Sequence, residues 1–139
     1  MKKILYILLT FCILFYGCAK ESNSVQLASV ENFMTDHFET SDFVPYSSRK
    51  YGTTLKEGVS VSIVVDPHQN VSEIRLAAIH PTEASFQILD DFIHYLPELV
   101  DFQQSDLDLD QKEIRIEESD YEIVYLNQKD SFSFAITWH

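Results

Sequence analysis

An alternating pattern between residues 59 and 79 limits the fold more than any other part of the sequence. Its first half places apolar residues at every second position: Val59, Val61, Ile63 and Val65. A period of two is the pattern of a strand with one buried face. Residues 66–70 contain turn-forming Asp, Pro and Asn, and residues 71–79 can return as a second strand. We therefore predict an antiparallel hairpin here.

Two helices are predicted on either side of this hairpin. Residues 25–38 repeat apolar side chains at spacings of three and four, with Ser24 placed to serve as an N-cap. After the hairpin, Pro81 and Thr82 open a segment whose apolar stripe continues to Leu96. Pro97 is expected to kink or end that second helix.

Three further strands are predicted over residues 113–118, 121–126 and 131–138, separated by short polar turns. The last of them carries no charge, so we expect it in the interior of the sheet or covered. Residues 39–58, which contain Pro45 and Gly52, are expected to form a long loop or a short irregular strand. The prediction is an α+β fold, in the order α-β-β-α-β-β-β, with about five antiparallel strands and both helices on one face.

The N-terminus carries a targeting pattern. Lys2 and Lys3 precede an apolar run over residues 4–16, which is too short for a membrane span of about 20 residues. The run ends at Gly17 and Cys18, and a small residue directly before a cysteine resembles the lipobox of bacterial lipoproteins. The resemblance covers residues 1–18. It implies cleavage before Cys18 and lipid attachment to its sulfur, although Phe15 and Tyr16 are bulkier than the residues usual in that motif.

The resemblance also sets the expected domain organisation. Residues 1–17 would be the signal peptide, 18–24 a short tether, and 25–139 a single α+β domain. Because Cys12 lies in the discarded run and Cys18 would carry lipid, the mature domain is expected to have no disulfide. Ala19 follows the cysteine where the inner-membrane type has Asp, so the resemblance favours an outer-membrane anchor facing the periplasm.

The charge of the chain is strongly acidic. Loss of Lys2 and Lys3 would leave eight basic against twenty-two acidic residues, a net charge of −14. Nucleic acid and anionic membrane surfaces are poor partners for such a body, whereas a basic protein would be attracted to it. A requirement for solubility alone would also account for the excess of acidic residues.

Two groups of residues are candidates for partner binding. One is the only basic cluster, Arg49 and Lys50, which lies between Tyr46 and Tyr51; both tyrosines are expected at the surface. The other is acidic and comprises Asp101, Asp106, Asp108, Asp110, Glu117, Glu118 and Asp120.

Spacing and composition argue against catalysis and resident cofactors. Asp106, Asp108, Asp110 and Glu117 match some calcium-ligating positions of an EF-hand, but Gln111 replaces its glycine, so we predict no metal site. No His pair has zinc-ligand spacing, and the mature chain has too few glycines for a phosphate loop or nucleophile elbow. We expect a binding protein with no enzymatic activity and no cofactor.

Two functions are compatible with these features. The first is a membrane-anchored periplasmic protein that captures or neutralises a basic protein, such as an immunity protein or an inhibitor. The second is a structural or assembly accessory lipoprotein of the cell envelope. Salt should distinguish them, because electrostatic capture weakens with ionic strength and apolar docking does not.

Overall fold

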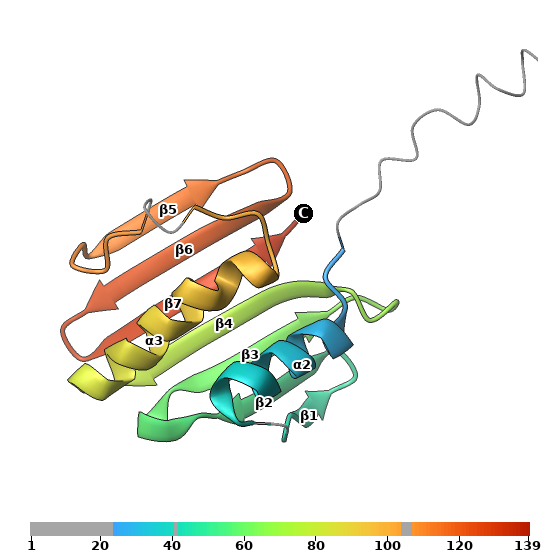
Figure 1. The fold of residues 1–139 in the computed structure, drawn as a ribbon, viewed down its shortest axis with the longest axis horizontal. Coiled ribbons are helices and arrows are strands. Elements are labelled where there is room, and N and C mark those ends of the chain that lie inside the picture. Colours follow the sequence, from blue (N-terminus) through green and yellow to red (C-terminus); the bar gives the residue numbers. More distant parts are fainter. Residues whose placement is uncertain (1–23, 41, 104–106) are drawn as a thin grey trace, which may run out of the picture.

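The computed structural model describes residues 24–40, 42–103 and 107–139 (Figure 1). Within these residues one antiparallel sheet of seven strands has the order β1-β2-β3-β4-β7-β6-β5. The elements are α2 (Leu27–Phe38), β1 (Val44–Ser47), β2 (Lys50–Thr54), η1 (Lys56–Gly58), β3 (Ser60–Val65), β4 (Val71–Ile79), α3 (Glu83–Tyr95), η2 (Leu96–Glu98), β5 (Glu113–Glu117), β6 (Tyr121–Gln128) and β7 (Ser131–Trp138). The α+β class is confirmed, whereas the prediction of about five strands is wrong.

β1 and β2 occupy residues 39–58, where a long loop or one short irregular strand was expected. All four β1 residues are exposed, so this strand has no apolar alternation to reveal it. In β2, Gly52 is buried although it has no side chain, because the ring of Tyr46 lies over it. Tyr51 pairs with Ile63 and packs against the core, so the prediction of a surface Tyr51 is wrong.

The predicted hairpin and the interior position of the last strand are both confirmed. β3 and β4 pair through a turn at residues 66–70, and β7 lies between β4 and β6. The strands bury one face of the sheet, with fully buried side chains at its centre: Ile63, Ile74, Leu76, Ile123, Tyr125, Phe134 and Ile136.

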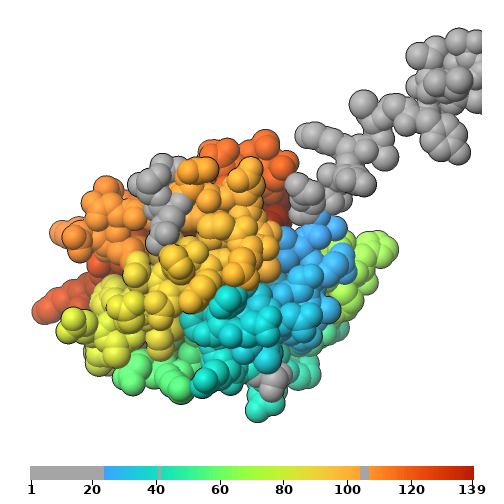
Figure 2. Space-filling model, in the orientation of Figure 1, coloured from blue at the N-terminus to red at the C-terminus, as the bar shows by residue number. Residues whose placement is uncertain are grey.

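Both helices cover that buried face (Figure 1), and Figure 2 shows them packed side by side. In α3, Phe92 packs its ring against Phe33 of α2 at 5.6 Å between centroids and against Phe134 of β7 at 5.9 Å. This one buried side chain therefore joins both helices to the sheet. The opposite face of the sheet has no helix over it in the described part of the chain.

The start of α2 differs from the prediction. Gln26 occupies the N-cap position without a side-chain cap, not Ser24. The carbonyl of Val25 accepts the N–H of Val71 at 2.7 Å, which keeps this stretch extended until Leu27. α3 begins at Glu83, with Thr82 as its N-cap in a reciprocal capping box with Ser85, so Pro81 precedes the helix and does not lie in its first turn as expected.

None of the helices in the described residues is long and apolar enough to cross a membrane. The predicted signal peptide, Cys18 and nearly all of the predicted tether lie outside the described residues.

Candidate functional site

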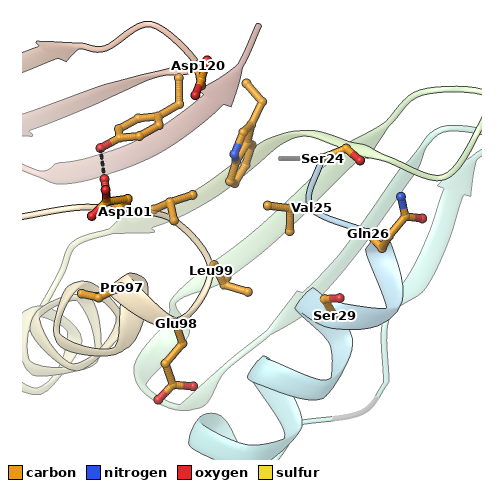
Figure 3. Close-up of a pocket in the computed structure, with 12 residues that line it drawn as sticks. Ser24, Val25, Gln26, Ser29, Pro97, Glu98, Leu99, Asp101 and Asp120 are labelled. Atoms are coloured by element: carbon orange, nitrogen blue, oxygen red, sulfur yellow. Dashed lines mark hydrogen bonds between the residues drawn. The ribbon is translucent and has the colours of Figure 1, made fainter. Parts of the chain in front are cut away.

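A cleft of about 540 Å³ opens between the start of α2 and the η2 turn that follows α3 (Figure 3). The ends of β6 and β7 contribute Tyr121 and Trp138 to it. In Figure 3, Asp101 and Asp120 lie on one side of the cleft, and Ser24, Gln26 and Ser29 lie on the other. We refer to this site as the acidic cleft.

The α2 side of the acidic cleft is fixed by the turn between β3 and β4. Leu27 N–H donates to the carbonyl of Gln69 at 3.0 Å, beside the bond between Val25 and Val71. Asp66 organises the turn, since its carboxylate accepts the N–H groups of His68 and Asn70 at 2.8 and 2.9 Å. The side-chain hydrogen bond from Asn70 is the main cause that lowers the pKa of Asp66, and desolvation by burial opposes it.

The opposite side of the acidic cleft is fixed by contacts between residues distant in sequence. The Tyr121 hydroxyl donates to the carbonyl of Asp101 at 2.7 Å, which holds the chain after η2 against β6. Val100 and Phe102 are buried on either side of Asp101, so the Asp101 side chain is left exposed. Asp101 therefore lies on the rim as a consequence of local packing.

Glu98 completes the acidic lining at the end of η2. Its carboxylate contacts Nε2 of His37 at 2.8 Å, and the His37 ring stacks on Tyr95 with 3.8 Å between centroids. This contact connects the C-terminal ends of α2 and α3. Glu98 thus has a structural partner, whereas Asp101 and Asp120 form no ion pair of up to 4.0 Å within the described residues.

Trp138 borders the acidic cleft and also a second hollow of about 350 Å³. Asp120 and Ser24 line both, and the second hollow adds Asp66 and His139. The two hollows therefore form a continuous acidic surface around the chain's only tryptophan.

The chemical character of the acidic cleft follows from its lining. Three carboxylates, several apolar side chains and an indole line it, and the described lining residues include no Lys, Arg or His. Carboxylates near an aromatic ring favour a cation that carries an apolar stem. Lysine and arginine side chains of another protein have this chemistry.

The structure brings together only some of the residues predicted for partner binding. Asp101 and Asp120 line the acidic cleft. Asp108 and Asp110 lie in the loop before β5, while Glu117 ends β5 and Glu118 follows it. Asp106 lies outside the described residues.

The aromatic and basic group lies elsewhere. Arg49 is in the turn between β1 and β2, and Tyr46 lies on the face of the sheet that the helices leave uncovered. The predicted acidic and tyrosine groups therefore do not form one continuous surface. Among the described residues, no three His, Cys, Asp or Glu side chains are placed to hold a metal ion.

The sequence analysis did not select Glu98, Tyr121 or Trp138. Trp138 lies at the end of β7, half-buried on the face that packs against the core. A lone Trp at a strand end beside an acidic turn was the available signal.

Neither a protein-family model, nor a curated protein, nor a solved structure matches the chain.

Proposed function

We propose that this chain is a lipid-anchored envelope protein that captures a basic protein through the acidic cleft, as an immunity protein or an inhibitor does. The observation that carries the proposal is the lining of the cleft, with three carboxylates beside Trp138 and no basic side chain among its described residues. The lipobox-like sequence before Cys18 supports the anchor, and the net charge of −14 expected after cleavage supports attraction of a basic partner.

The physical roles of the cleft residues differ. Asp101 and Asp120 supply charge that would accelerate encounter and orient the cationic group. Trp138 supplies aromatic surface for the apolar stem and for cation–π contact, worth about 0.5–2 kcal/mol. Glu98, already held by His37, ties η2 to the C-terminal end of α2 and so helps to fix the η2 side of the cleft.

The anchor is tested by labelling cells with radioactive palmitate. The wild-type chain should incorporate label and fractionate with membranes, and Cys18→Ser should lose both properties. A wild-type chain that takes up no label, or a Cys18→Ser variant that stays in membranes, would contradict the anchor.

Capture is tested by co-purification of the full-length chain in detergent. Basic envelope proteins should be recovered with the wild type and lost with Asp101→Asn/Asp120→Asn. The matched control is Asp90→Asn/Asp130→Asn, which removes the same charge at exposed positions outside the cleft. This control should recover the same partner as the wild type.

Ionic strength separates capture from the accessory role. Exposed charges are screened over about 8 Å at physiological salt, so recovery through the cleft should fall steeply as salt rises. Recovery that is equal in the cleft variant and insensitive to salt would contradict capture and favour apolar docking on an envelope assembly.

A further inference from the structure

The uncovered face of the sheet gathers the exposed apolar side chains. The exposed large hydrophobic residues of the described chain are Val44, Tyr46 and Ile79, at 56%, 72% and 79% exposure. The strand register places all three on this face: Val44 pairs with Gly52, Tyr46 covers Gly52, and Ile79 alternates with buried Ala78. Between them the face is built of small or half-buried residues: Ser60, Ser62, Val64, Ala77, Val124, Leu126, Ser131, Ser133 and Ala135.

The charge on the uncovered face also differs from the rest of the molecule. Its strands present three basic and four acidic side chains, namely Lys50, Arg75, Arg115, Glu73, Glu113, Glu117 and Glu122. The other described residues include four basic and sixteen acidic ones. The net charge is thus −1 on this face and −12 elsewhere. Two copies of the chain repel each other electrostatically except through this face.

The order of charges across the face suits a two-fold axis. One row, read across neighbouring strands, is Lys50, Val64, Glu73, Thr137, Glu122 and Glu117. Lys50 marks its basic end in β2, and Glu122 lies in β6 at the acidic end. β4 is the middle strand, so an axis along β4 places β2 of one copy over β6 of the other. Lys50 of each copy then faces Glu122 of its partner, which also pairs with Arg115 of its own chain, and near the axis each copy keeps its own Glu73–Arg75 pair at 3.0 Å.

The size of the face is adequate for a dimer. Seven strands spaced about 4.8 Å apart and roughly 20 Å long give ~600 Å² of projected area, close to the ~800 Å² per partner of a standard interface. We propose that the uncovered sheet face binds a second copy of this chain, so that two sheets pack face to face as in a β-sandwich. The acidic cleft lies on the helix side of each copy and stays open, so the dimer does not depend on the proposed capture.

The test is the mass of the full-length chain in detergent by light scattering, from micromolar to millimolar concentration. The wild type should be a dimer that added salt does not dissociate, because salt also screens the repulsion between the acidic remainders of the two copies. Ser62→Glu/Ser133→Glu places two carboxylates on the face and should give a monomer. The control Ala28→Glu/Ala84→Glu adds the same charge at exposed helix positions and should remain a dimer.

The variant Ile79→Ser distinguishes loss of dimerisation from loss of folding, because a side chain that is 79% exposed contributes little to the stability of the folded monomer. It should raise the dimer dissociation constant about tenfold or more without lowering the unfolding midpoint of the monomer. A wild type that is monomeric throughout, or face variants that dimerise as tightly as the wild type, would overturn the proposal. Recovery of a different protein on this face in place of the second copy would overturn it as well.

Discussion

Phe92→Ala should be among the most destabilising substitutions in this domain. Phe92 is fully buried, and its ring neighbours lie on both α2 and β7, at centroid distances of 5.6 Å for Phe33, 6.1 Å for Phe38 and 5.9 Å for Phe134. Truncation of a core Phe to Ala costs about 3–5 kcal/mol, and several lost aromatic pairs move the cost toward about 5 kcal/mol. A typical domain has about 5–15 kcal/mol of stability, so much of it would be lost.

Urea denaturation measures this loss. With a slope of about 1.5 kcal/mol/M, the midpoint should fall by roughly 3 M. Phe86→Ala is the control on the same helix, because Phe86 is half-buried and has Phe132 as its aromatic neighbour at 5.0 Å. It should cost about 2 kcal/mol. Equal losses for the two variants would refute the assignment of Phe92 as the side chain that joins both helices to the sheet.

Two predictions concern pH. Burial, with a smaller contribution from Asp110, raises the pKa of the Tyr125 hydroxyl above its ordinary value of 10.0, so the folded state holds this proton more tightly than the unfolded state. The stabilisation that this hydroxyl contributes is complete below pH 10.0 and is lost as the pH rises above it. The unfolding midpoint of Tyr125→Phe should therefore decrease less at alkaline pH than that of the wild type. Midpoints of the two proteins that decrease in parallel with pH would contradict this. The pKa of Asp66 is lowered from 3.8, chiefly by the Asn70 side chain, so its stabilising effect is present above 3.8 and is lost as pH falls through the lower folded value. Asp66→Asn should lower the thermal midpoint at neutral pH and reduce its dependence on acid, and a midpoint unchanged at pH 7 would show that the turn does not depend on this carboxylate.

The part of the fold that was predictable is the part whose side chains face two different environments. β3 and β7 alternate between the core and the uncovered face, and their patterns predicted strands and an interior position. β1 lies at the edge with both faces exposed, so burial imposed no alternation on its sequence. In β2, the buried position is Gly52, and its cover is the side chain of Tyr46 from the neighbouring strand. Local hydrophobicity cannot show such a contact.

The acidic cleft was only partly predictable for a related reason. Asp101 and Asp120 were selected because they belong to an acidic stretch, but acidity alone did not separate them from Asp108 or Asp110. Their shared position results from the hydrogen bond between the Tyr121 hydroxyl and the Asp101 carbonyl, which joins residues 20 apart in the sequence. The N-terminal wall likewise depends on the pairing of Val25 with Val71, which displaced the expected cap at Ser24.

The fluorescence of Trp138 tests the central claim most directly, because Trp138 is the only tryptophan in the chain and borders the acidic cleft. The full-length protein is titrated with a short arginine-containing peptide and, separately, with a glutamate-containing peptide of equal length. A cleft that binds basic side chains predicts a saturable change with the arginine peptide alone, weakened by salt and abolished in Asp101→Asn/Asp120→Asn but retained in Asp90→Asn/Asp130→Asn. The same response to both peptides, or an undiminished response in the cleft variant, would contradict it.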